Sequence, residues 1–293
     1  MPLHTLEKYA RLATEKRQAV RESPCRFLVS AMMAGAYIGL AIILIYTLGT
    51  EAAPEYRHLI MGVSFGIGLT LVVFAGSELF TGQTMYMTIG LISGRTSLDD
   101  LVRVWSVSWL GNFGGAVLVA LLFTAGGGGP LLFAGNDYLF EVATAKMNAP
   151  VSALIARAIL CNWLVCLALW TSSRMSGDAA KCIAIFWCLF AFVASGYEHS
   201  IANMTVLTLS LLGDHPASVS LAGMLHNLLW VTLGNAIGGA VFMAGAYSYV
   251  GRRGEASPAA EGPAVSLPAL VTGVLPAPMA PAGLRRTAGP GSP

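Results

Sequence analysis

The sequence predicts an all-α membrane protein with six transmembrane helices, of which the second and the fifth are broken near their middle. Hydrophobic residues make up 55% of the chain and charged residues only 11%, whereas soluble domains carry about a quarter charged residues. A helix needs about 20 apolar residues to cross a bilayer. Such stretches lie at about residues 27–48, 58–92, 104–124, 151–171, 182–212 and 220–250.

The distribution of basic residues predicts that both termini are cytoplasmic. Fourteen of the 17 Lys and Arg residues fall in residues 1–26, in the loops after the second and fourth stretches, and in the C-terminal tail. Only Arg57 and Lys146 lie in loops on the opposite side, and Arg157 falls inside the fourth stretch. Cytoplasmic loops carry an excess of Lys and Arg, so this bias sets the orientation.

Two regions flank the predicted six-helix transmembrane domain, residues 27–250. In residues 1–26, apolar residues fall at helical spacing against a basic face, which predicts an amphipathic helix on the cytoplasmic surface. A solvated leader that only sets the topology is the alternative. The apolar positions are Leu6, Tyr9, Ala10, Ala13 and Val20. Residues 251–293 are rich in Pro and Gly, so we expect a disordered cytoplasmic tail.

Two pairs of similar strings indicate an internal duplication. Residues 110–117 read LGNFGGAV and residues 233–241 read LGNAIGGAV, which is one residue longer. At a similar separation, AGSE at 75–78 matches SGYE at 195–198. Each copy then holds three helices, and because three is odd the second copy is inverted in the membrane. The glycines of the paired strings have a second explanation, namely close packing of helices.

Polar residues interrupt the second and fifth stretches, in FAGSELFTGQT and VASGYEHSIAN. Unwound backbone is tolerated at that depth only where protein buries it or where it lines a watery cavity. The exposed ends of half-helices also attract anions. Glu78 and Glu198 lie at equivalent places in the two interruptions. We interpret them as structural acceptors for the freed backbone amides, with a proton relay as the alternative.

His199 is the only histidine deep inside a predicted stretch. Ionisable groups in a membrane interior are costly and usually functional, although a neutral imidazole that ties two helices together is a second explanation. No other His or Cys stands at ligand spacing, so the sequence predicts neither a metal site nor a cofactor. It offers no second catalytic group near His199, which argues against a membrane-embedded enzyme, the rival from another class.

Four features together resemble the formate/nitrite transporter family over about residues 5–250: GSELFTG, ASGYEHSIANM, CNWLVCLALW and the paired GN-x-GG motifs. The resemblance implies an aquaporin-like six-helix fold, a homopentamer with one pore per protomer, and a place in the bacterial inner membrane. The two N-P-A motifs of a true aquaporin are absent. Residues 77–82, SELFTG, are more similar to the nitrite branch than to the formate branch.

By this resemblance, His199 is the central pore histidine and Thr81 is its neighbour across the pore. Asn162 and Lys146 match positions associated with the periplasmic approach and with favourable potential near the histidine. The implied constrictions are Phe65, Leu69 and Phe192 on the cytoplasmic side and Leu79 on the periplasmic side. The N-terminal helix corresponds to one implicated in gating.

The resemblance and the chemistry together predict a channel or transporter for small monovalent anions, foremost nitrite. Formate and hydrosulfide are the alternatives within the family. A bare charge crosses an apolar constriction at high cost, and each of these anions is the conjugate base of a weak acid. An imidazole, whose unperturbed pKa is about 6.5, could bind the anion and donate a proton. The expected partners are the anion, protons, membrane lipid and further copies of the chain, but not nucleic acid.

Overall fold

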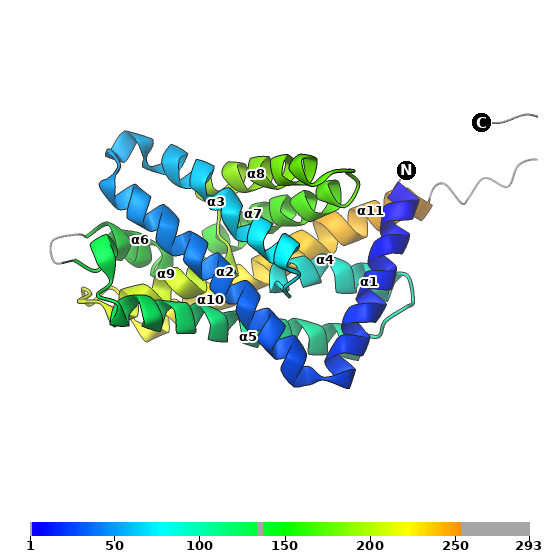
Figure 1. Ribbon diagram of the computed structural model, residues 1–293. Helices are drawn as coiled ribbons and strands as arrows, with labels where there is room; N and C mark the ends of the chain where they lie inside the picture. Colours follow the sequence, from blue (N-terminus) through cyan, green and yellow to red (C-terminus); the bar gives the residue numbers. More distant parts are fainter. Residues whose placement is uncertain (1, 134–136, 253–293) are drawn as a thin grey trace, which may run out of the picture. The chain divides into compact units, whose positions relative to one another are not determined.

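The computed structural model describes residues 2–133 and 137–252, and within these ranges every regular element is a helix (Figure 1). The helices are α1 (Pro2–Glu22), α2 (Pro24–Glu51), η1 (Pro54–Tyr56), α3 (Arg57–Ala75), α4 (Phe80–Ile92), α5 (Leu98–Ala125), η2 (Gly129–Leu131), α6 (Tyr138–Met147), α7 (Val151–Ser172), α8 (Asp178–Ala194), α9 (Ser200–Leu212), α10 (Leu221–Ile237), η3 (Gly238–Gly245) and α11 (Ala246–Arg252). The predicted disordered tail lies, from residue 253 on, outside the described residues.

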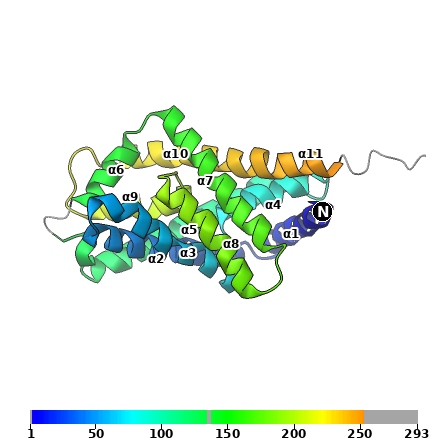
Figure 2. The ribbon, with the colours of Figure 1, turned by 90° about the horizontal axis from the view of Figure 1, so that it is seen from above.

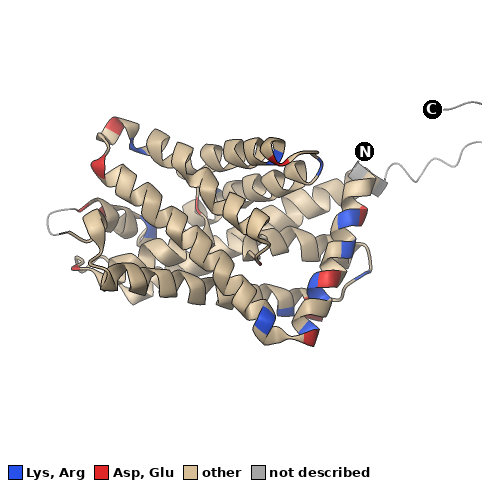
Figure 3. Cartoon of the chain, viewed as in Figure 1, with Lys and Arg blue, Asp and Glu red and all other residues tan. Residues whose placement is uncertain are grey.

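Several of these helices are long and apolar enough to cross a membrane. Within the described ranges there are five, at Pro24–Glu51, Pro54–Ala75, Leu98–Ala125, Val151–Ser172 and Leu221–Gly251. The fifth predicted stretch instead contains α8, with 17 residues, and the short apolar helix α9, with 13. Most of the charged residues lie toward the two ends of the helices, and few lie between them (Figure 3). This distribution fits a chain whose middle lies in hydrocarbon.

The second and fifth predicted stretches are each divided into two helices. Helix α3 ends at Ala75 and α4 begins at Phe80, while α8 ends at Ala194 and α9 begins at Ser200. A glycine follows each first half-helix in the left-handed region, Gly76 with φ 72° and Gly196 with φ 69°. Glycine adopts this conformation without the steric penalty of a Cβ. The two interruptions are therefore equivalent in backbone as well as in sequence.

The repeated glycines hold helix backbones in contact. A Cβ on Gly115 of α5 would lie 1.9 Å from the carbonyl oxygen of Met32 in α2, and one on Gly238 would lie 2.6 Å from that of Ile159 in α7. No side chain fits at either position, because real Cβ atoms do not approach within 3.0 Å. Close packing, the second explanation of the motif, thus accounts for these glycines.

The extra residue in the second copy of the motif is absorbed as a stretch of π-helix. Residues Gly238–Gly245, η3, follow α10 directly and continue into α11. In Figure 2 the three elements form one continuous rod, coloured yellow to orange. An inserted residue widens one turn of an α-helix rather than breaking it. Asn112 and Asn235 thereby keep equivalent places although one string is longer.

Helix α1 has the amphipathic pattern that the sequence predicts. Its buried apolar residues are Tyr9, Ala10, Ala13 and Val20, with Leu6 half-buried. The Tyr9 hydroxyl donates to the Leu169 carbonyl oxygen at 2.7 Å, and the Tyr9 ring stacks between Tyr86 and Trp170. Burial raises the pKa of Tyr9, so it stays a neutral donor. Helix α1 is therefore packed against α4 and α7 rather than extending into solvent.

Candidate functional site

Each helix break is held by one asparagine of the repeated GN-x-GG motif. Asn112 Oδ1 accepts the backbone N–H of Phe80 at 2.8 Å, and its Nδ2 donates to the carbonyl oxygens of Ala31 and Glu78. In the second half, the backbone N–H of Ser200 donates to Asn235 Oδ1 at 2.8 Å, and Asn235 Nδ2 donates to the carbonyl oxygens of Ala158 and Glu198. These two residues were not among the predicted site residues. The signal was their repetition in both copies of the motif.

The carboxylates at the breaks have partners other than those predicted. Glu78 accepts hydrogen bonds from Gln83 and Lys16, both at 2.5 Å. In the other break, Glu198 accepts from Asn203 at 2.6 Å and from Lys146 at 2.8 Å. The first amides of α4 and α9 donate to the two asparagines instead. The predicted bonds from freed amides to the carboxylates are thus replaced by ion pairs and side-chain amide bonds.

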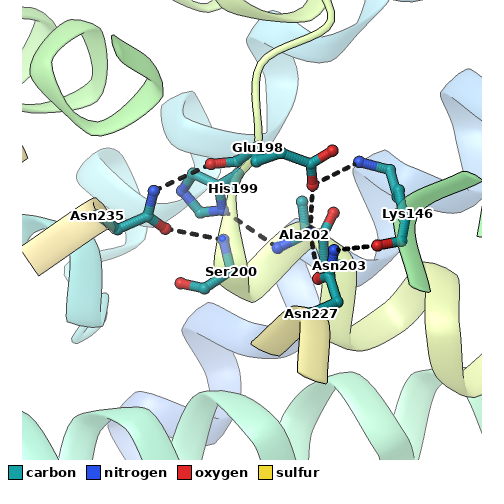
Figure 4. Close-up of polar contacts among 8 residues, drawn as sticks. All are labelled: Lys146, Glu198, His199, Ser200, Ala202, Asn203, Asn227 and Asn235. Atoms are coloured by element: carbon teal, nitrogen blue, oxygen red, sulfur yellow. Dashed lines mark hydrogen bonds and ion pairs between the residues drawn. The ribbon is translucent and has the colours of Figure 1, made fainter. Parts of the chain in front are cut away.

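The two ion pairs extend the internal repeat to the helices that precede each half. Lys16 comes from α1 and Lys146 comes from α6, and each reaches the glutamate of the following break. Helix α1 therefore corresponds to α6. Asn227 completes the second cluster, because its Nδ2 donates to the Lys146 carbonyl oxygen and its Oδ1 accepts from Asn203 (Figure 4). Lys16 and Lys146 lie outside the two pairs of matched strings. Comparison of those strings therefore did not reveal that the two lysines are equivalent.

His199 caps α9 through its ring. Its Nδ1 accepts the backbone N–H of Ala202 at 3.1 Å (Figure 4). Its Nε2 lies 3.3 Å from Oγ1 of Thr81, in the first turn of α4. Because Nδ1 is an acceptor, the proton of the neutral ring belongs on Nε2, which faces Thr81. The contact brings together two predicted site residues that are 118 positions apart.

Aromatic rings cover the histidine. The rings of Phe192 and His199 are stacked with centroids 5.9 Å apart and an interplanar angle of 14°. Phe65 meets Phe192 edge to face at 5.5 Å. His199 itself is only 3% exposed. The imidazole and the threonine hydroxyl beside it thus form a polar edge next to these aromatic rings.

Two cavities lie on either side of the breaks. The α6-side cavity, about 260 Å³, is lined by His199, Glu198 and Lys146, together with Phe65 and Phe192. The α1-side cavity, about 340 Å³, is bordered by residues of α1 and by Lys181, Glu78 and Gln83 among others. Each volume holds several water molecules or one small anion. His199 lines the α6-side cavity, and Leu79 and Gly82, which lie on either side of Thr81 in the chain, line the α1-side cavity.

The four predicted constriction residues group differently from the prediction. Phe65 and Phe192 line the α6-side cavity, whereas Leu69 and Leu79 line the α1-side cavity. The sequence-based expectation instead puts Leu69 with Phe65 and Phe192 on the cytoplasmic side and Leu79 on the periplasmic side. Leu79 is the residue just before α4, so it faces the same cavity as the end of α3, where Leu69 lies. The path of the backbone through the break, rather than the order of these residues in the chain, decides which cavity each residue lines.

Asn162 lies behind the break rather than in either cavity. It is fully buried, and its Nδ2 donates to the Thr81 carbonyl oxygen, to Oγ1 of Thr84 and to the Asn235 carbonyl oxygen at 2.6–3.2 Å. It is absent from the walls of both cavities. Asn162 thus links α4 to the asparagine that holds the other break. Among the described residues, no group of three His, Cys, Asp or Glu could hold a metal ion.

The chain is similar to known proteins over most of its length. The family described as formate/nitrite transporter matches residues 5–249. The nitrite transporter NirC of Escherichia coli K12 is 52% identical over 245 residues, which cover 84% of this chain and 91% of that protein. A solved structure of an FNT family ion channel is 50% identical with a TM-score of 0.83, covering 85% of this chain and 99% of that one. A pentameric formate channel with formate bound is 26% identical with a TM-score of 0.66, covering 78% and 98%. The chain therefore belongs to the formate/nitrite transporter family.

Proposed function

We propose that this protein is a channel for small monovalent anions, foremost nitrite. The observation that carries the proposal is the contact between His199 and Thr81, which joins the two helix breaks at 3.3 Å. It lies beside the rings of Phe65 and Phe192 in the wall of the α6-side cavity. A hydrogen-bond donor set among apolar side chains can hold an anion that has lost its water.

The hydrogen bonds of His199 determine what the ring can do. With Nδ1 accepting from Ala202, the neutral ring donates a hydrogen bond through Nε2 but has no proton to give away. Proton donation requires the cationic ring, in which both nitrogens are protonated. Nδ1 must then release the Ala202 amide. Proton-coupled movement of a weak-acid anion therefore requires that the hydrogen bond between the Ala202 N–H and His199 Nδ1, at the start of α9, be broken.

The helix ends at the breaks support electrostatic attraction of an anion to the His199–Thr81 contact. Lys146 and Lys16 lie near the breaks, each held by a glutamate. In addition, the half-helices α4 and α9 both begin at the breaks, where helix N-termini favour negative charge. Thr81 and His199 stand at these two N-termini. An anion at their contact would therefore meet two helix ends as well as the imidazole.

The orientation and assembly complete the proposal. The excess of Lys and Arg supports cytoplasmic termini in a bacterial cell. In that orientation the α1-side cavity opens to the cytoplasm and the α6-side cavity to the periplasm. The similar formate channel is pentameric, which supports a homopentamer in the inner membrane with one pore in each protomer. We expect transport without covalent change of the anion.

A second candidate substrate is formate. A formate-bound channel has the same fold as this chain, and formate, like nitrite, has two oxygens that share one negative charge. Hydrosulfide is the third candidate from the family resemblance. Nothing about the His199–Thr81 contact selects among these ions by shape, since it offers one ring N–H and one hydroxyl.

Flux measurements in proteoliposomes test the proposal. Initial uptake of nitrite, formate and hydrosulfide is measured in parallel, and rates from empty vesicles and from the His199→Phe variant are subtracted. We expect nitrite uptake well above both controls, with the chemical identity of the ion unchanged inside the vesicle. Uptake equal to that of empty vesicles would refute the proposal. Recovery of a different product would show an enzyme instead.

A further inference from the structure

Arg157 is a charged residue in the first half of the apolar helix α7. It lies six residues after the start of α7, which is about 9 Å along the helix axis. Its side chain is exposed, and within the described part of the chain no hydrogen bond or ion pair of the guanidinium is found. A charge at this depth in hydrocarbon is costly unless it faces water or a partner. Arg157 satisfies that condition because it lines the α6-side cavity.

The residue stands next to the second helix break, with His58 on the other side of it. The Arg157 carbonyl oxygen accepts the backbone N–H of Glu198 at 3.4 Å. A Cβ on Gly196 would lie 3.9 Å from Cε1 of His58, and His58 also lines the α6-side cavity. Arg157 and His58 thus flank the same short non-helical stretch, Ser195–His199, from α7 and from α3.

The charges of the cavity show what Arg157 adds. Among the described residues that line it, Glu198 is the only acid and Lys146 and Arg157 are the only Lys or Arg. Lys146 is paired with Glu198 at 2.8 Å, with side-chain exposures of 15% and 4%. That pair carries no net charge. The uncompensated positive charge of the α6-side cavity therefore belongs to Arg157, not to the lysine that the sequence analysis singled out.

We infer that Arg157, with His58, forms an outer binding subsite for a small oxyanion in the α6-side cavity, before the anion reaches His199. A guanidinium presents two parallel N–H groups, which match the two oxygens of nitrite or formate. The inference rests on the proposed function, and it adds the residue that recruits the anion on one face only. The equivalent position in the first half is Ser30, whose carbonyl oxygen accepts the Glu78 N–H at 3.4 Å. Among the described residues that line the α1-side cavity there is no arginine.

The test is the concentration dependence of nitrite uptake in proteoliposomes. Arg157→Gln removes the charge, Arg157→Lys retains it, and Arg57→Gln removes a charge at the same end of the helices from a residue outside the cavity wall, whose guanidinium covers the Tyr138 ring. We expect Arg157→Gln to raise the half-saturating nitrite concentration about three- to fivefold with little change in the maximal rate. Arg157→Lys keeps the charge but not the paired N–H groups, so its value should fall between those of the wild type and Arg157→Gln. Arg57→Gln should keep the wild-type value.

Two results would overturn the inference. One is an unchanged half-saturating concentration in Arg157→Gln. The other is an equal rise in Arg57→Gln, which would show a general effect of positive charge at this end of the helices rather than a subsite. Calorimetric titration of the detergent-solubilised wild type and Arg157→Gln with sodium nitrite measures the affinity for nitrite independently of transport. Weaker binding in Arg157→Gln together with no wild-type flux would refute the proposed function alone. Equal binding in the two proteins would refute the subsite.

Discussion

Asn112 and Asn235 hold the two helix breaks through the same set of hydrogen bonds. Each accepts the first amide of a half-helix at 2.8 Å and donates to one carbonyl oxygen of the break and to one of a neighbouring helix. Both side chains are fully buried. The relationship explains why two interrupted helices persist at a depth where bare backbone groups are costly.

Substituting either asparagine with alanine is expected to destabilise the protein. Each substitution leaves one amide and two carbonyl groups without these bonds, at about 1–3 kcal/mol for each buried group left unpaired. Asn148→Ala is the matched control, because Asn148 is exposed. Thermal unfolding in detergent and oligomer yield by gel filtration measure the effect. Equal melting temperatures for Asn235→Ala and Asn148→Ala would contradict it.

Two substitutions of His199 separate its capping role from its role toward the anion. Asparagine is a good N-cap residue and can accept the Ala202 N–H, whereas phenylalanine cannot. We expect His199→Asn to be more stable than His199→Phe by about 1 kcal/mol. Both should lose nitrite uptake to the level of empty vesicles. Wild-type uptake in either variant would remove His199 from the pathway.

The buried pair Lys146–Glu198 is expected to stabilise the protein rather than to select the ion. Glu198→Gln leaves the lysine charge 15% exposed and without its partner, a loss of about 3–5 kcal/mol for a buried pair. Adding Lys146→Met to Glu198→Gln should recover part of the stability. Thermal unfolding compares the stability of the wild type, Glu198→Gln and the double variant. The ratio of nitrite flux to formate flux measures the selectivity. A stable Glu198→Gln protein with altered selectivity would place Glu198 in the pathway.

Acid pH on the α6 side is expected to speed nitrite uptake. As the pH falls, a larger fraction of His199 carries a second proton, on Nδ1, in exchange for the Ala202 bond. The cationic ring attracts the anion and can give up a proton, and the neutral acid then passes Leu69 and Leu79, which line the α1-side cavity, at lower cost than an ion. Initial uptake against external pH measures this, after subtraction of His199→Phe vesicles. A flat difference curve would leave His199 as a hydrogen-bond donor only.

Removal of residues 256–293 is expected to leave nitrite uptake unchanged. This segment is rich in Pro, Ala and Gly and contains none of the motifs of the site, so it has little apolar surface to bury. Oligomer yield and flux of the shortened chain, compared with the full chain at equal protein, provide the check. A loss of flux at normal yield would assign the tail a part in regulation.

Much of the architecture was predictable from the sequence. The apolar stretches, the interruptions around Glu78 and Glu198, and the repeated GN-x-GG motifs all report on properties that are local in the chain. Hydrocarbon selects apolar runs about 20 residues long, and close helix contact selects glycine. Both requirements act on residues that are close together in the chain, so they leave patterns that can be read from short segments of the sequence.

The pairing of side chains across the molecule was decided only by the tertiary structure. Which residue bonds the freed amides, which lysine meets which glutamate, and which cavity each constriction residue faces all depend on helices distant in the chain. The site at His199 and Thr81 exists because the second copy is inverted and its half-helix meets that of the first copy. Buried polar groups take whichever partner the packed helices bring within hydrogen-bond distance, and that proximity leaves no periodic signal in the sequence.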